Sequence, residues 1–325
     1  MALEQPSVNH NDTQWQRNTI EKLATSALSE QKTARRWGIF FKILTFAYLF
    51  TILFVALGWV GGEDKSGEHT ALIEVSGTIE AGGAVNADAF ISSLHDAYED
   101  KGTKGIVLRI NSPGGSPVQA GIINDEIKRQ KKLHPNIPVY AVVEDICASG
   151  GYYIAVAADK IYVNQASIVG SIGVLMDGYG FTETMNKIGV ERRLMTAGEN
   201  KAMLDPFSPV NPKHQAFAQN MLNEIHEQFK TVVRNGRGTR LKETPETFSG
   251  LFWSGEQSIK LGLADAYGSA DFVAREVIKQ EKIVDFSYQE DFASRIAKRI
   301  GASASASFGE TLAKQVIKSG EIRLH

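Results

Sequence analysis

The chain has 325 residues, of which 43% are hydrophobic and 22% are charged, and its formal net charge is −2 at pH 7. This balance is that of a globular protein with one sizeable core, and it excludes the basic surface that a nucleic-acid partner would require. Cys147 is the single cysteine, so an intrachain disulfide is excluded, and its place in an apolar run favours a packing role.

The N-terminal part of the chain predicts a membrane anchor over residues 37–60. The segment from Ile43 to Val60 carries no charge, and 18 helical residues span about 27 Å. Two arginines, Arg35 and Arg36, precede the segment, and acidic residues follow it. The positive-inside rule therefore predicts that residues 1–36, which include one polar helical stretch, are cytoplasmic. A cleaved signal peptide would have a shorter apolar core nearer the start.

Beyond a linker over residues 61–69, short apolar runs alternate with helical stretches as far as residue 285. Because the runs are almost continuously apolar, they predict a parallel sheet with helices on both faces, in an α/β domain. The expected strands are 70–77, 104–113, 137–149, 160–164, 167–176 and 191–197. The expected helices are 86–100, 118–134, one directly after Ser149, 179–189, 211–237, and shorter ones near 244–251, 254–262 and 271–281. The tail, 286–325, holds a low-complexity linker and a short amphipathic piece.

One serine, Ser149 in "ASGGYY", lies where a predicted strand turns into a helix. Such a turn raises a side chain sharply and leaves backbone N–H groups free at the helix start, which suits a nucleophile. The alternative is a helix N-cap, a common role for serine that needs no chemistry. The local sequence leaves both interpretations open.

A second loop, "RINSPGGS" over residues 109–116, follows another predicted strand. Gly114 and Gly115 can adopt backbone angles closed to other residues and bring bare N–H groups close to a ligand. Ligands bind at the carboxyl ends of parallel strands, and both loops lie at such ends. We expect the two loops to form an oxyanion hole, and the alternative is a tight turn without a ligand.

The general base is harder to place, because none of the seven histidines lies between Ser149 and His214. This spacing argues against a Ser-His-Asp triad without excluding one, since triads are defined by geometry and not by order. Lys201 follows a predicted strand and a Gly-Glu-Asn turn, and it precedes three apolar residues. A lysine acts as a base only when it is neutral, which burial favours. The alternative is an ordinary solvated lysine.

Five motifs, in order, resemble those of the short-form signal peptide peptidase A family of protease IV-like serine peptidases. They are "INSPGG", "ASGGYY", "VGSIGV", "GENK" and "FWSGEQSIKLGLAD", and they cover about 70–285. The resemblance implies a Clp protease/crotonase-like fold and a Ser-Lys dyad. By motif, Ser149 is then the nucleophile, Lys201 the base and Ser171 the residue that orients the lysine. The N–H groups of Gly114 and Gly150 form the oxyanion hole.

The same resemblance implies a membrane-anchored endopeptidase that degrades cleaved signal peptides and similar hydrophobic peptides, without a metal or cofactor. It further implies a homo-oligomeric ring whose active sites are shared between subunits. The protein is then expected to be a single-pass protein of the cytoplasmic membrane with a periplasmic protease domain. Three alternatives stay open: a protease that cuts a membrane protein near its hydrophobic segment, a crotonase-like acyl-CoA-binding domain, and a non-catalytic scaffold.

Overall fold

The computed structural model describes residues 10–56 and 66–288. The first of these ranges is one continuous helix, α1 (His10–Ala56), which contains both the predicted polar helical stretch and most of the predicted anchor. Its part from Arg17 to Phe54 is long and apolar enough to cross a membrane. The end of the predicted anchor, 57–60, and most of the predicted linker lie outside the described residues, as does the tail from residue 289.

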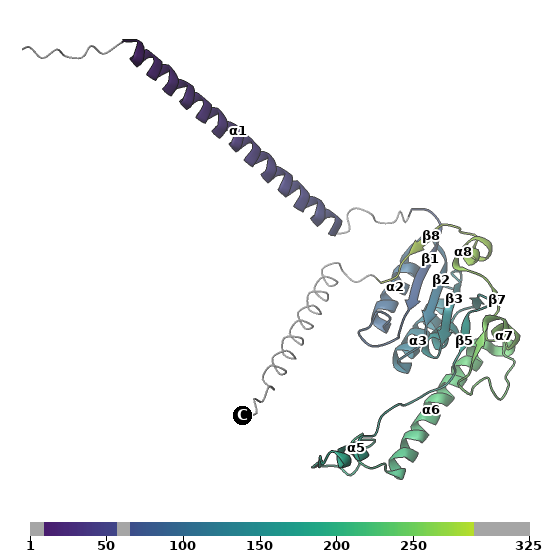
Figure 1. The fold of residues 1–325 in the computed structure, drawn as a ribbon. Helices are drawn as coiled ribbons and strands as arrows, with labels where there is room; N and C mark the ends of the chain where they lie inside the picture. The colour runs from purple at the N-terminus through teal and green to yellow at the C-terminus, as the bar shows by residue number, and fades with distance from the viewer. Residues whose placement is uncertain (1–9, 57–65, 289–325) are drawn as a thin grey trace, which may run out of the picture. The chain divides into compact units, whose positions relative to one another are not determined.

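The second range, 66–288, forms the predicted α/β domain (Figure 1). Its strands are β1 (His69–Ser76), β2 (Thr103–Ser112), β3 (Val139–Ala148), β4 (Lys160–Val163), β5 (Ile168–Gly170), β6 (Phe252–Ser254), β7 (Ala266–Tyr267) and β8 (Ile283–Asp285). Its helices are α2 (Ala87–Glu99), α3 (Pro117–Leu133), α4 (Gly150–Ala155), α5 (Thr182–Lys187), α6 (Pro212–Arg237), α7 (Gly255–Lys260) and α8 (Ala270–Phe272). A 3-10 turn, η1 (Gly238–Arg240), and a π-helical turn, η2 (Val273–Ile278), complete it.

The strands form one sheet in the order β6-β5-β3-β2-β1-β8, with β4 paired to β3 and β7 paired to β4. Every pairing is parallel except that of β5 with β6. Most residues of the central strands β1, β2 and β3 are buried, which confirms the prediction of a parallel sheet covered on both faces. Because the strands are parallel, the carboxyl ends of β2, β3 and β5 lie side by side at one edge.

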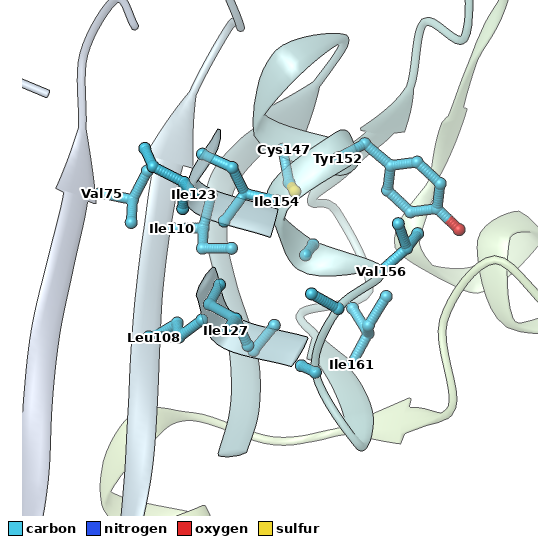
Figure 2. Close-up of a cluster of buried hydrophobic side chains, with 14 of the residues drawn as sticks. Val75, Leu108, Ile110, Ile123, Ile127, Cys147, Tyr152, Ile154, Val156 and Ile161 are labelled. Carbon is cyan, nitrogen blue, oxygen red and sulfur yellow. The ribbon is translucent and has the colours of Figure 1, made fainter. Parts of the chain in front are cut away.

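The main core lies between one face of the sheet and helices α2, α3 and α4 (Figure 2). Ile110 of β2, Ile123 of α3 and Ile154 of α4 are fully buried there, and Cys147 of β3 lies among them, as the sequence predicts. A smaller cluster on the opposite face of the sheet contains one residue from each of β1, β2, β3 and β4, among them Leu72, together with Val273 of η2. The apolar surface buried in these layers fixes the strand ends that carry the candidate site.

Three of the predicted elements are wrong. Residues 191–197 form no strand and residues 244–251 form turns, while the strand predicted over 167–176 ends at Gly170. From there residues 174–211, which we call the arm, run with α5 along the outer end of α6, away from the sheet (Figure 1). Within the arm, the helix predicted over 179–189 is confirmed as the shorter α5, whereas residues 191–197, predicted as a strand, leave Leu194 45% and Met195 95% exposed. Strands β6, β7 and β8 are too short to show a periodicity.

Candidate active site

Ser149 occupies the sharp turn between β3 and α4. Its φ is +51°, a left-handed conformation that serine rarely adopts. It precedes the first helical residue, but its side chain makes no capping hydrogen bond, so the N-cap interpretation is wrong. The core fixes the turn from both sides, because Ala148 and Gly150 are buried. The half-buried Ser149 is thus held in a strained backbone conformation, and its hydroxyl makes no capping hydrogen bond to α4.

Ser171 lies beside Ser149 on the neighbouring strand. Ala148 of β3 is in register with Gly170 of β5, so the two serines follow directly on paired residues. The Ser149 N–H donates to the Gly170 carbonyl over 2.9 Å, and neighbouring strands lie about 4.8 Å apart. Ser171 repeats the strained conformation, with φ +50°, and its N–H donates to the Leu251 carbonyl. Two similarly strained hydroxyl residues therefore lie next to each other at the edge of the sheet.

The glycine loop after β2 packs directly against the Ser149 turn. A Cβ on Gly114 would lie 2.7 Å from the Gly150 nitrogen and 2.7 Å from the Ser149 Cβ, so only glycine fits there. Gly114 has φ +102° and Gly115 has φ +148°. This close approach confirms that the two loops meet, as expected for the carboxyl ends of neighbouring parallel strands.

The hydrogen bonds of this loop decide which N–H groups remain available. The Gly114 N–H donates to Ser112 Oγ over 3.2 Å, and the Gly114 carbonyl accepts from the Ile79 N–H over 2.9 Å. A trans peptide directs its N–H opposite its carbonyl, so the Gly115 N–H faces away from Ile79. The Gly115 nitrogen lies 3.3 Å from where a Cβ on Gly150 would be. The resemblance assigned this role to Gly114, but its N–H is taken by Ser112, so the Gly115 N–H is the loop donor that remains beside Gly150.

Gly150 supplies the second available N–H. It is the first residue of α4, and the first N–H groups of a helix have no partner within that helix. They lie at the positive end of the helix dipole, which favours a developing negative charge. The turn therefore combines a strained hydroxyl with backbone donors, the arrangement that acyl transfer requires.

Lys201 lies in the arm, where its side chain is exposed, so its predicted burial does not occur within the chain. The neighbouring Asn200 bonds to His214 at the start of α6. Fifteen residues further along α6, Phe229 packs against Tyr153, four residues after Ser149. Fifteen residues of helix span about 22 Å, so one chain does not bring Lys201 to Ser149.

No described histidine forms a hydrogen bond with Ser149. On α6, the Nε2 of His226 donates to the backbone carbonyl of Ile172 over 3.1 Å, directly after Ser171. Four other described histidines have contacts elsewhere: His214 with Asn200, His95 with Glu126, the buried His69 with the Gly67 carbonyl, and His134 with the ring of Tyr98. Within the described ranges, the structure offers no Ser-His pair of the kind found in a triad.

A protein-family model described as Peptidase family S49 matches residues 131–284. Among curated proteins, a protein of Brucella melitensis named Na(+)/H(+) antiporter NhaA is 45% identical over 175 residues, covering 54% of this chain and 24% of that protein. The putative signal peptide peptidase SppA of Enterococcus faecium is 31% identical over 233 residues, covering 68% of this chain and 67% of that protein. A putative protease of Synechocystis is 32% identical over 201 residues, covering 62% of this chain and 70% of that protein.

The chain spans about a quarter of the antiporter-named relative, but two thirds or more of the two peptidase-named ones. Together with the strained serine turn and the glycine loop, these matches identify the class as that of the Clp protease/crotonase-like α/β proteins. The chain belongs to peptidase family S49.

Proposed function

We propose that the protein is a serine endopeptidase, held to a membrane by α1, that degrades cleaved signal peptides and similar hydrophobic peptides. The observation that carries this proposal is the Ser149 turn: a hydroxyl at φ +51° that caps no helix and lies against a glycine loop with available N–H groups. A structural serine would have no reason to hold that strain. The peptidase-named relatives, of which one is called a putative signal peptide peptidase, supply the substrate class.

The proposed reaction is acyl transfer through Ser149. Neutral Lys201 takes the hydroxyl proton as Oγ attacks the scissile carbonyl, and the ammonium then returns this proton to the leaving amine. The resulting acyl-enzyme is hydrolysed by a water that the same lysine activates. Ser171 orients the lysine amine. The oxyanion binds the Gly150 N–H and one N–H of the glycine loop, for which we now favour Gly115 over Gly114.

The base is proposed to come from a second copy of the chain. About 22 Å of α6 separates the Lys201 turn from the Ser149 region, so a shared site is required if the two residues react together. The arm also exposes large apolar side chains, among them Leu175 at 84%, Met195 at 95% and Val210 at 71%. Such a surface is typical of an interface, and covering it would remove Lys201 from water, which favours the neutral amine. A closed ring of identical subunits would bring Lys201 of one subunit to Ser149 of the next and would cover the apolar surface of the arm.

The proposed topology places residues 1–36 in the cytoplasm and the protease domain on the periplasmic side of the cytoplasmic membrane. It rests on Arg35 and Arg36 before the apolar part of α1 and on the acidic residues after it. Signal peptides remain in this membrane after cleavage, so an anchored domain would meet them there. A C-terminal reporter that is active only outside the cytosol tests this orientation, and activity of a cytosolic reporter alone would contradict it.

Labelling with a fluorophosphonate probe tests the chemistry. We expect the wild-type protein to be labelled on Ser149, the Ser149→Ala variant not at all, and the Lys201→Ala variant at a rate at least 100-fold lower. The His226→Gln variant, which keeps a donor for the Ile172 carbonyl, is the matched control and should label normally. Labelling that requires His226 and not Lys201 would replace the proposed base. A fluorogenic signal-peptide substrate compared with a full-length membrane protein separates the two substrate classes.

A further inference from the structure

The segment that carries Lys201 is a pair of tight turns and not a regular element. The Lys201 N–H donates to the Gly198 carbonyl over 3.1 Å, and the Met203 N–H donates to the Asn200 carbonyl over 3.1 Å. Gly198 and Leu204 enclose these turns with positive φ values of +103° and +55°. Turns of this kind need contacts with the rest of the protein to stay in one conformation, because they belong to neither a helix nor a sheet.

An ion pair joins the two ends of this segment. Arg192 bonds to Asp205, thirteen residues further along the chain, and its guanidinium lies 5.4 Å from the centre of the Phe207 ring. Phe207 in turn stacks on Phe181 at 5.4 Å. The Asp205 side chain is only 11% exposed and also accepts a hydrogen bond from the Ser208 hydroxyl. These contacts fix the two ends of the loop but leave its tip, with Lys201, to be fixed by other means.

The tip is fixed by one side-chain contact to a helix. Asn200, the residue before Lys201, accepts a hydrogen bond at Oδ1 from Nε2 of His214 over 3.1 Å. In the part of the chain that the structure describes, no other side-chain hydrogen bond joins residues 198–203 to a regular element. His214 lies in the first turn of α6, which is held by the Asn211 cap and by Pro212.

We propose that Asn200 and His214 are positioning residues that set the direction of the Lys201 side chain toward the serine of the next copy. This rests on the proposed function, because it assigns Lys201 as the base. Because Asn200 directly precedes Lys201, the hydrogen bond that holds Asn200 against α6 also holds the backbone of Lys201. Its loss should let the amine move while leaving the apolar surfaces of the arm, and therefore assembly and substrate binding, in place. An amine displaced by about 1 Å lowers the rate roughly 100-fold.

The test compares kcat, KM and oligomer size for His214→Ala, Asn200→Ala and the double variant. We expect kcat to fall about 10- to 100-fold in each, KM to change less than about twofold, and the double variant to be no slower than either single one. His214→Gln, whose amide can donate from nearly the same place as Nε2, should recover most of kcat. Gln219→Ala, on the same helix with its side chain bonded to Asn223, is the control and should behave as wild type.

Three outcomes would overturn the positioning role. The first is full kcat in His214→Ala while Lys201→Ala is inactive, which leaves the dyad intact and removes the positioning. The second is an equal loss in His214→Gln and His214→Ala, which would mean that the ring packs and does not donate. The third is a multiplicative loss in the double variant, which would show that the two residues act separately. Full activity of Lys201→Ala would instead refute the proposed base itself.

Discussion

Replacing Gly114 by alanine perturbs the candidate site without removing any reacting group. The new Cβ would lie 2.7 Å from the Gly150 nitrogen and from the Ser149 Cβ, and 2.9 Å from the Ala148 carbonyl oxygen, whereas ordinary contacts begin near 3.4 Å. None of these three atoms can rotate away, because two belong to the backbone and the third is the first side-chain carbon. The Ser149 turn must therefore move by about 0.7 Å relative to the glycine loop, from 2.7 Å to 3.4 Å.

The consequence should be a large loss of rate with a modest loss of stability. A displacement approaching 1 Å at a reacting group costs roughly 100-fold in kcat. The left-handed backbone adds about 1 to 2 kcal/mol of strain for any residue with a side chain. For a domain of this size, each kcal/mol lowers the melting temperature by roughly 2 to 4 °C.

Gly77→Ala is the matched control for this prediction. Gly77 has a similar φ of +94°, also follows a strand at this edge of the sheet, and has open space where its Cβ would be. It should lose a similar few degrees of melting temperature but keep its kcat. Peptide hydrolysis and circular dichroism melting are measured on both variants, so that the loss of rate is separated from the loss of stability. If Gly114→Ala hydrolyses peptides as fast as Gly77→Ala, the contact with the Ser149 turn has no catalytic importance and the reasoning fails.

Three further predictions concern the fold that carries the site. Burial raises the pKa of the Cys147 thiol, so iodoacetamide should modify it only after unfolding, and inhibition of the native protein by this reagent would contradict its packing role. The hydrogen bond from Arg129 lowers the pKa of Glu126 to about 2 from the ordinary 4.5, so the stabilisation is present above pH 4.5 and is lost as the pH falls toward 2. Urea midpoints of wild type and Glu126→Gln should therefore differ at pH 6 and converge near pH 2, and a constant difference would refute this. The buried Arg237 forms a bidentate pair with Asp265, so Arg237→Met should destabilise the fold by about 3 kcal/mol, and an unchanged urea midpoint would contradict that.

The place of the Ser149 turn could be predicted from local signals, but its role could not, because a helix N-cap fits the same stretch. An apolar strand ends at Ala148, small residues follow, and parallel strands bring their carboxyl ends to one edge. The oxyanion donors could be predicted only in part. The sequence of the glycine loop does not reveal that Ser112 Oγ accepts a hydrogen bond from the Gly114 N–H, which leaves the Gly115 N–H as the loop donor beside Gly150.

Sequence reasoning fails for residues 191–197 of the arm and for the burial of Lys201, and the reason is physical. Apolar periodicity reports that a side chain avoids water, but not which surface covers it. Leu194 and Met195 were therefore assigned to a strand of this chain, although both are exposed in it. The same holds for Lys201, whose apolar neighbours suggest burial that a single chain does not provide. In the proposed assembly another copy of the chain would cover these residues, so that an interface would carry the sequence pattern of a core.

The central claim is that Ser149 of one copy reacts with Lys201 of another, and mixing two inactive variants tests it most directly. Ser149→Ala keeps the lysine and Lys201→Ala keeps the serine, so each alone should be inactive. Both variants are co-expressed in equal amounts and purified as one oligomer. Half of the subunits then supply an intact serine and half supply an intact lysine, so roughly a quarter of the shared sites should contain both. The account predicts hydrolysis near a quarter of the wild-type rate. Mixed oligomers that stay as inactive as each variant alone would contradict it.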